Sequence, residues 1–369
     1  MEPWWVKKKS ELASIASQMS PVVVYDDETL NEAFFDLLCI EGLDALVYRV
    51  GLNSHPRILE KIVKLGGLLE CSSPFELQTL MGLYLPVPLK QIILGEKFAE
   101  QYRKDIKNLC PTAIITVPEL FPRLMAVGID VCISIDLAHG EHGGAESGGE
   151  LRRLQEAANV LADKVKAVEM VRLTGGFEGA GFKKLDFLID FLEKVLFVFP
   201  HVKTIVLSRY LGLDKDPWTG YPDLERTASR YESLMRKFPT VRFWADPEEL
   251  MIEHAGGLLT PANNVRESQQ GLVAELPVPA KFFRIPSKGS GRESVYNISK
   301  DRLIYLDWSF GGQGRVSETM ASFSLEGGVS KGDLLFIPQQ GICGTELEGN
   351  HWNLPAYYLR ARRMCAVKL

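Results

Sequence analysis

A short tract after residue 135 gathers side chains that could bind a metal ion. Asp136, His139, Glu141 and His142 form an Asp-x-x-His-x-Glu-His cluster, and imidazole nitrogens and carboxylate oxygens are common ligands of divalent metals. The spacing is not one of the familiar ligand patterns, and the tract is rich in glycine, which favours an exposed loop. We therefore expect a solvated loop and no metal site.

Two other groups could do acid, base or nucleophilic chemistry. Cys343 would become a nucleophile if His351 or an arginine lowered the pKa of its thiol, while a buried structural cysteine is the commoner state. Asp307 and Glu318 could form an acid/base pair, and a place on an ordinary β-domain surface is their simpler account. We keep Cys343 as a candidate catalytic residue.

The bulk composition is that of an ordinary globular protein. The 369 residues are 46% hydrophobic and 24% charged, with a net charge of -5, which gives no reason to expect nucleic acid as a partner. We find no apolar run of membrane-spanning length and no signal peptide at the N-terminus. We therefore expect a cytoplasmic protein with no nucleic-acid or membrane partner, whose scattered cysteines are free thiols.

Short apolar runs alternate with amphipathic stretches from about residue 22 to residue 255, as a parallel sheet with crossover helices predicts. The expected strands are 21–25, 45–50, 67–71, 91–94, 113–116, 131–135, 167–173, 204–207 and 241–245. The expected helices are 29–38, 56–65, 74–82, 149–161, 184–199 and 223–238. So many units in one stretch fit a (β/α)8 TIM barrel better than an open sheet.

After Leu259 the chain becomes richer in Gly, Pro and β-forming residues, which predicts a β domain. Its expected strands are 280–285, 294–298, 303–308 and 333–338. We expect the first twenty residues to pack on this domain. The predicted organisation is thus a barrel domain, 22–255, and a β-barrel or β-sandwich domain formed by 1–21 plus 256–369.

One stretch carries a family resemblance. Tyr48-Arg49-Val50-Gly51-Leu52-Asn53-Ser54-His55-Pro56 resembles the Tyr-Ala-Ile-Lys-Ala-Asn-Pro-His-Pro signature of the fold-type III pyridoxal-phosphate decarboxylases, in particular the diaminopimelate decarboxylase half of bifunctional aspartate kinase/diaminopimelate decarboxylases. Further matches follow the family order at 20–26, 69–76, 243–250, 331–337, 341–344 and 350–354. The resemblance implies an alanine-racemase-like barrel, a C-terminal β domain joined by the N-terminal segment, and a dimer.

The departures from the family pattern fall on the cofactor site. The lysine that holds pyridoxal phosphate as an imine corresponds to Gly51, which has no amine. The histidine that stacks on the pyridine ring corresponds to Arg172. The glycines of the phosphate loop correspond to 208–210, Ser-Arg-Tyr, whose side chains would crowd the backbone amides.

The remaining departures change charge or remove a ligand-binding group. In the family motif Glu-Pro-Gly-Arg, the ring-nitrogen carboxylate corresponds to Asp246, and the phosphate-side Gly-Arg corresponds to Glu248 and Glu249, which would repel a phosphate. The family cysteine that completes the site across the dimer has no counterpart, and the tyrosine of Gly-Ala-Tyr corresponds to Cys343. We therefore expect no cofactor, and specifically no pyridoxal phosphate.

The mouth of such a barrel is the expected pocket, and in this chain it would be lined by charge. The candidate ligand-binding residues are Arg49, Arg172, Arg209, Tyr210 and Ser73, and the candidate acid/base residues are Asp246, Glu248 and Glu249. This mixture of charges suits a zwitterionic or carboxylate-bearing ligand. In the alternative interpretation the charges pair with one another and fill the mouth.

Two main functional hypotheses follow. In the first, a degenerate decarboxylase-like protein binds or transforms an amino-acid-like small molecule without pyridoxal phosphate, by a lyase-like reaction if it is an enzyme, and forms a homodimer. In the second, it is a pseudoenzyme, a catalytically inactive paralogue that regulates an active decarboxylase or pairs with it, or with another partner, in a heterodimer. A third reading is a pyridoxal-phosphate-dependent decarboxylase of the diaminopimelate type.

Overall fold

The chain folds into two compact units, which we describe from a computed structural model. One unit is Ala33–Leu250, and the other combines Met1–Glu32 with Met251–Leu369. The structure describes residues 3–96, 98–99, 101, 112–136, 149–174, 185–208, 223–247, 252, 254–268, 271–278, 292–307, 321–325, 328–338 and 356–359.

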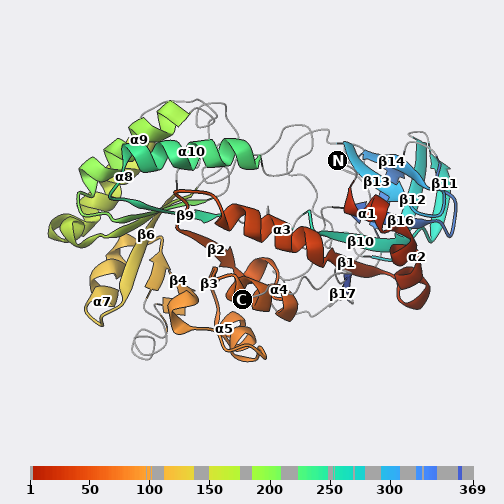
Figure 1. The fold of residues 1–369 in the computed structure, drawn as a ribbon, viewed down its shortest axis with the longest axis horizontal. Helices are drawn as coiled ribbons and strands as arrows, with labels where there is room; N and C mark the ends of the chain where they lie inside the picture. The colour runs from red at the N-terminus through yellow and green to blue at the C-terminus, as the bar shows by residue number, and fades with distance from the viewer. Residues whose placement is uncertain are drawn as a thin grey trace. The chain divides into compact units, whose positions relative to one another are not determined.

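The unit Ala33–Leu250 contains a closed barrel of eight parallel strands, as the sequence predicted (Figure 1). The strands are β2 (Ala45–Arg49), β3 (Leu68–Cys71), β4 (Ile92–Gly95), β5 (Thr112–Ile115), β6 (Asp130–Asp136), β7 (Met170–Thr174), β8 (Thr204–Ser208) and β9 (Arg242–Asp246). The helices are α4 (Pro56–Lys64), α5 (Pro74–Met81), α7 (Phe121–Met125), α8 (Gly149–Leu161), α9 (Leu185–Val198) and α10 (Leu224–Lys237), while α3 (Asp27–Leu38) crosses into this unit.

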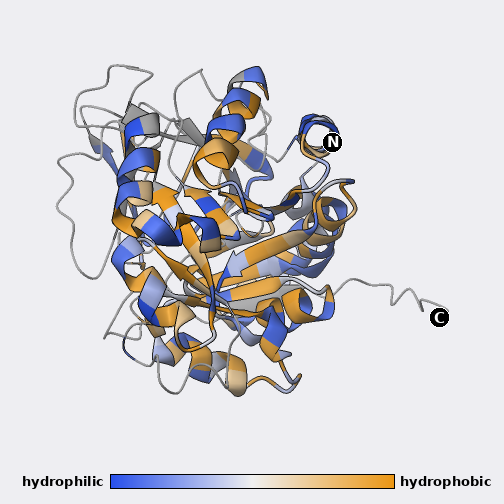
Figure 2. Ribbon diagram, turned by 90° about the vertical axis from the view of Figure 1, so that its left-hand side faces the viewer, coloured by the Kyte–Doolittle hydropathy of each residue, from blue (hydrophilic) through white to orange (hydrophobic). Residues whose placement is uncertain are grey.

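Capping residues mark the N-termini of several of these helices in the sequence. Ser73 is the N-cap of α5, and its hydroxyl accepts a hydrogen bond from the Glu76 amide, in a Ser-Pro-x-Glu start that is typical of a helix N-terminus. His55 caps α4 in the same way. The amphipathic helices cover the barrel with their apolar faces. Figure 2 shows apolar residues along the strands, and both apolar and hydrophilic residues on the helices.

The other unit is built around a nine-stranded sheet in the part of the chain that the structure describes. In spatial order its strands are β11 (Asn264–Ser268), β12 (Gly271–Leu276), β15 (Ala321–Leu325), β14 (Arg302–Asp307), β13 (Arg292–Asn297), β16 (Leu334–Pro338), β10 (Gly256–Pro261), β1 (Val22–Asp26) and β17 (Ala356–Leu359). All neighbouring pairs are antiparallel except β1 and β17. The predicted strand at 280–285 lies outside the described residues.

The N-terminal helices α1 (Trp4–Lys7) and α2 (Lys9–Gln18) pack on this sheet, as the sequence predicted. The rings of Trp4 and Trp5 lie 5.2 Å and 5.9 Å from the ring of Phe336, measured between centroids. A Cβ atom at Gly257 would lie 2.1 Å from the Phe336 ring. Position 257 must therefore be glycine for this aromatic group to sit against β10.

One predicted strand lies in a different sheet from the one expected. The sequence analysis assigned 21–25 to the barrel, but strand β1 pairs with β10 and β17 in the β unit. The division of the chain therefore differs from the predicted boundaries at residues 22 and 255. Within the described residues, no helix has both the length and the apolar character that a membrane span requires.

Candidate functional site

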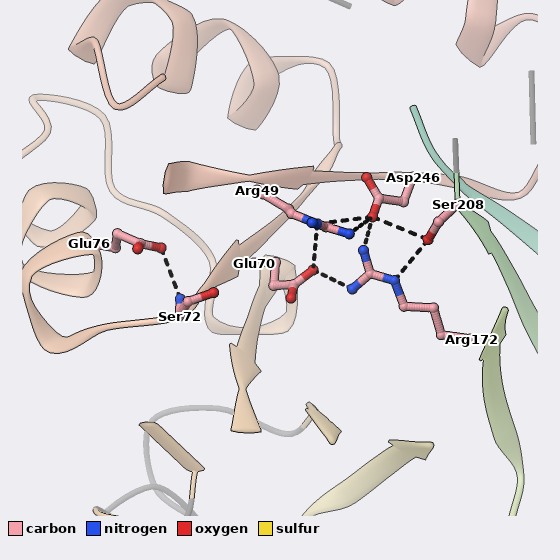
Figure 3. A network of polar contacts seen from close by, with 7 residues as sticks. All are labelled: Arg49, Glu70, Ser72, Glu76, Arg172, Ser208 and Asp246. Atoms are coloured by element: carbon pink, nitrogen blue, oxygen red, sulfur yellow. Dashed lines mark hydrogen bonds and ion pairs between the residues drawn. The ribbon is translucent and has the colours of Figure 1, made fainter. Parts of the chain in front are cut away.

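Side chains that point into the barrel form two successive layers. Alternate residues of a strand point to the same side, and the deeper layer is apolar, with Val47, Ile93, Ile114, Cys132 and Val206 as its buried core. Five polar residues lie nearer the carboxyl ends of β2, β3, β7, β8 and β9, each two positions after an apolar residue that belongs to the deeper layer or packs against it. They are Arg49, Glu70, Arg172, Ser208 and Asp246 (Figure 3).

Arg172 lies at the centre of this polar network. Its Nη1 donates to Glu70 Oε2 over 2.7 Å, its Nε donates to Ser208 Oγ over 2.9 Å, and its Nη2 forms an ion pair with Asp246. Only 3% of the Arg172 side chain is exposed, and Asp246 and Ser208 are fully buried. The guanidinium of Arg172 is thus committed to three buried partners.

Arg49 completes the network from a more exposed position. Its Nε and Nη2 both lie 3.2 Å from Asp246 Oδ2, and its Nε lies 3.9 Å from Glu70 Oε2. About a third of its side chain, 32%, is exposed. Register places Arg49 beside Glu70 and Ser208 beside Asp246 on neighbouring strands. The two guanidinium groups therefore balance the two carboxylates, and the network carries no net charge.

Cys132 lies beneath this layer and is fully buried. Burial raises the pKa of the Cys132 thiol, an effect that the nearby Arg172 charge opposes and the Glu70 charge reinforces. Because only a thiolate is strongly nucleophilic, Cys132 acts here as a small apolar side chain of the barrel core.

Gly51 lies just beyond the end of β2, in the short 3₁₀ helix Val50–Leu52. A Cβ atom at this position would lie 3.3 Å from Glu76 Oε1, and its three nearest heavy atoms would all belong to the Glu76 carboxylate. Glu76 Oε2 accepts a 2.8 Å hydrogen bond from the Ser72 amide (Figure 3). Glu76 Oε1 accepts one of 3.2 Å from Ser73 Oγ. A carboxylate thus faces the position where the resemblance implies a lysine.

His55 follows Gly51 and begins α4. Its Nδ1 accepts a 3.3 Å hydrogen bond from the Arg57 amide, which only a neutral imidazole can do. Burial, with a contribution from the Arg57 charge, lowers the pKa of His55 below its usual value. The neutral form that caps the helix is therefore the form that the structure favours.

The structure brings some of the predicted site residues together. Arg49, Arg172 and Asp246 meet in one network, while Ser73 caps α5. Arg209, Tyr210, Glu248, Glu249, Cys343 and His351 lie outside the described residues.

The predicted metal cluster lies mostly outside them as well. Only its first member, Asp136, is described. Among the described residues, no group of three or more His, Cys, Asp and Glu side chains is placed to hold a metal ion.

Sequence reasoning did not single out Glu70 or Glu76 as site residues, and it named Ser208 only as part of the tract that corresponds to the phosphate loop. The signal for Glu70 was a lone charge in the apolar run Leu68-Leu69-Glu70-Cys71, at a position that alternation directs into the barrel. The signal for Glu76 was its place three residues after Ser73, which is the spacing of a capping box.

No protein-family model and no curated protein matches this sequence. Solved structures do match the fold over most of the chain. The arginine decarboxylase of Paramecium bursaria Chlorella virus, bound to agmatine, has a TM-score of 0.66 and 12% identity, and the match covers 95% of this chain and 100% of that one.

Two further decarboxylases give similar values. The lysine/ornithine decarboxylase of Vibrio vulnificus, complexed with cadaverine, has a TM-score of 0.67 and 12% identity, with coverage of 95% and 98%. A diaminopimelate decarboxylase has a TM-score of 0.66 and 14% identity, with coverage of 92% and 88%. At these identities the likeness concerns the fold. The chain has the fold of the fold-type III pyridoxal-phosphate decarboxylases.

Proposed function

We propose that this protein uses the decarboxylase fold without pyridoxal phosphate, and binds an amino-acid-like, carboxylate-bearing molecule in the barrel mouth. The observation that carries this proposal is the partly exposed Arg49 guanidinium, which lies on a buried and charge-balanced network. Any chemistry on the ligand would be lyase-like and would not depend on a cofactor.

The residues at the barrel mouth do not fit pyridoxal phosphate. The resemblance implies a lysine at position 51 and a carboxylate at position 246 for the ring nitrogen. Gly51 offers no amine, and Asp246 is already bonded to both Arg172 and Arg49. A protonated ring nitrogen would compete with Arg172 for the same buried carboxylate. Displacing Arg172 from this buried ion pair would cost several kcal/mol of free energy.

Arg49 is the described mouth residue best suited to a ligand carboxylate. A guanidinium carries five N–H donors in a planar fork that matches a carboxylate, and a ligand would reach it through its exposed third. Because the network is neutral as a whole, a zwitterion enters with less repulsion than an anion. This favours an amino-acid-like ligand over a simple dicarboxylate.

Two measurements test the proposal. After incubation with pyridoxal phosphate and removal of the excess, the protein should show no absorbance band near the visible edge that borohydride abolishes. A thermal-shift screen against the common amino acids should then find at least one stabilising ligand, since a ligand at 100 times its Kd contributes about 2.7 kcal/mol.

The Arg49→Ala variant should lose this ligand-induced shift, and the Arg152→Ala variant should keep it, because Arg152 is an exposed residue of α8. A borohydride-sensitive band, or a wild-type protein that no amino acid stabilises, would contradict the proposal.

A second candidate function rests on a different surface. On α5 and the segment after it, the apolar side chains Phe75, Met81 and Tyr84 are 59%, 69% and 100% exposed, and exposed apolar groups in one segment are typical of protein interfaces. This favours an inactive paralogue that pairs with another chain, either a second copy or an active decarboxylase. Light scattering tests it: a molar mass near 41 kDa for the protein alone and no complex with an active decarboxylase would count against it.

A further inference from the structure

We infer that the half of the barrel mouth formed by β4, β5 and β6 receives the side chain of the ligand, and that it selects a small, uncharged side chain with a hydroxyl or an amide group. This inference rests on the proposed function, because it assigns a further part of the same site. Ser134 is the residue that would form a hydrogen bond with that group.

The residues at the carboxyl ends of the barrel strands, which we call the mouth layer, divide into two unlike halves. The Arg172 side chain starts on β7 and reaches Glu70 on β3 (Figure 3). These two strands lie opposite each other, because four strand steps separate them in a closed barrel of eight. On one side of the Arg172 side chain lie β8, β9 and β2, which carry Ser208, Asp246 and Arg49. The rest of the charged network therefore belongs to that half.

The other half carries small, uncharged residues. Gly95 ends β4, Thr116 directly follows β5 and Ser134 lies on β6, each two positions after a residue of the apolar layer beneath. A Cβ atom at Gly95 would lie 3.1 Å from both the Cα and the Oγ of Ser72, and Ser72 and Thr116 are both exposed. Hydroxyl groups therefore line this half of the mouth layer, and solvent reaches it.

The Ser134 hydroxyl is buried, and it forms no hydrogen bond within the part of the chain that the structure describes. Only 7% of the residue is exposed, and alternation from Cys132 of the apolar layer turns its side chain into the barrel. At the same level, Ser208 bonds two residues of the network, and the Thr116 hydroxyl donates to Glu96. Buried hydroxyl groups are as a rule hydrogen-bonded, so the Ser134 hydroxyl is suited to a ligand.

An ionised side chain on the ligand would not fit this half. A cation beside Ser134 would lie next to the Arg172 guanidinium, which register places on the neighbouring strand. An anion would lie near Glu96, whose Oε2 accepts a 2.9 Å hydrogen bond from the Val117 amide at the rim. A buried charge without an opposite charge is strongly disfavoured, whereas a serine hydroxyl can both donate to and accept from a hydroxyl or an amide.

The positions of Arg49 and Ser134 limit the size of the ligand. Strands β2 and β6 also lie opposite each other, so a ligand with its carboxylate at Arg49 and its side chain at Ser134 would cross the mouth over the Arg172 side chain. The interior of an eight-stranded barrel is just wide enough for side chains to fill. The class of ligand is therefore a small amino acid, of the size of threonine or glutamine.

The simpler alternative is that residue 134 is small only to leave space for Arg172 beside it. The Ser134→Ala variant separates the two roles, because alanine stays small but has no hydroxyl. Since the hydroxyl has no partner among the described residues, this variant should keep the Tm of the ligand-free protein within about 2 °C of the wild type, or raise it. A matched control is Ser233→Ala on α10, where the hydroxyl donates to the Ser229 carbonyl over 2.8 Å.

The experiment is isothermal titration of the full-length protein with two matched pairs of probes. L-threonine and L-valine have the same shape and differ by a hydroxyl against a methyl group, and L-glutamine and L-glutamate differ by an amide against a carboxylate. The wild-type protein and the Ser233→Ala variant should bind threonine and glutamine about 5- to 100-fold more tightly than their pair members, because a buried polar group left without a partner costs that much. The Ser134→Ala variant should lose the preference for threonine or reverse it.

Several results would overturn the inference. They are equal binding of threonine and valine by the wild type, tighter binding of glutamate than of glutamine, and a preference for threonine that survives in Ser134→Ala. A larger fall in Tm for ligand-free Ser134→Ala than for the control would also overturn it, because the hydroxyl would then have a structural partner.

The amino-acid screen separates this inference from the proposed function. Failure of all four probes in a protein that the screen shows to bind other amino acids overturns the inference and leaves the proposed function standing. If no amino acid stabilises the wild type, both fail.

Discussion

Replacement of Arg172 by methionine should destabilise the barrel strongly. Methionine keeps most of the side-chain volume but removes three contacts, to Glu70, Ser208 and Asp246. Two buried carboxylates would then share one guanidinium, that of Arg49, which is 32% exposed. Removing one partner of a buried ion pair costs about 3–5 kcal/mol, because the other charge stays buried without compensation.

The expected loss of stability can be measured as a fall in the melting temperature, Tm. For a unit the size of Ala33–Leu250, each kcal/mol lowers Tm by about 2–4 °C, so Arg172→Met should lower it by about 6–20 °C. Circular dichroism at helical wavelengths follows the barrel, which contains most of the long helices. The control is Arg152→Met, which breaks the 2.7 Å pair with Glu156 at a site that is 80% exposed, and should shift Tm by less than about 2 °C.

A second substitution tests the physical cause of the loss. If the cost comes from uncompensated charge, the double variant Arg172→Met with Glu70→Gln should be more stable than Arg172→Met alone, with a coupling of about 0.5–3 kcal/mol. The reasoning fails if Arg172→Met shifts Tm no more than Arg152→Met does. It also fails if Glu70→Gln adds a full further loss to that of Arg172→Met.

Three further outcomes follow from the structure. The pKa of His55 is lowered in the folded state, so as the pH falls the unfolded chain binds a proton at His55 before the folded protein does. The urea midpoint of the wild type should therefore fall as the pH drops below about 6.5. The variant His55→Asn keeps an acceptor for the helix cap and should lose this pH dependence. The Gly51→Lys variant, incubated with pyridoxal phosphate, should give no borohydride-sensitive absorbance band, because Asp246 is still paired with Arg172. The appearance of such a band would show that the missing lysine is the only obstacle to cofactor binding. The Gly257→Ala variant should destabilise the β unit by at least about 1–3 kcal/mol through overpacking, because the added methyl group would lie 2.1 Å from the Phe336 ring. Its Tm, followed by tryptophan fluorescence, should fall accordingly. An unchanged melting curve would contradict the tight packing.

The sequence was sufficient for the barrel because its signal is local. Each of the eight barrel strands is a short apolar run followed by a helical or turn signal, and the predicted ranges agree with the structure to within a few residues. Strand β1 shows the limit of such signals. Val22–Asp26 is buried along its whole length, as a barrel strand would be, and its sheet is decided by pairing with residues such as Leu259, far away in the chain.

The sequence singled out three of the five network residues, Arg49, Arg172 and Asp246, but not the contacts that they make. The resemblance pointed to Arg172 and Asp246, and alternation explains why both face the barrel interior. Their pairing with Glu70 and Ser208 depends on which strand ends meet when the barrel closes, and no local pattern contains that information. Arg172, predicted as a ligand-binding residue, is buried and contacts Glu70, Ser208 and Asp246.

The contact between Arg49 and Asp246 has a consequence for the lifetime of the folded barrel. The two residues are 197 positions apart and join β2 to β9, the first and last barrel strands. These strands share two register pairs, Ala45 with Trp244 and Leu46 with Ala245, whereas β8 and β9 share five. Contacts that close so long a loop form late in folding, and interactions formed after the transition state act mainly by slowing unfolding. The contact between Arg49 and Asp246 should therefore act mainly by slowing the unfolding of the barrel.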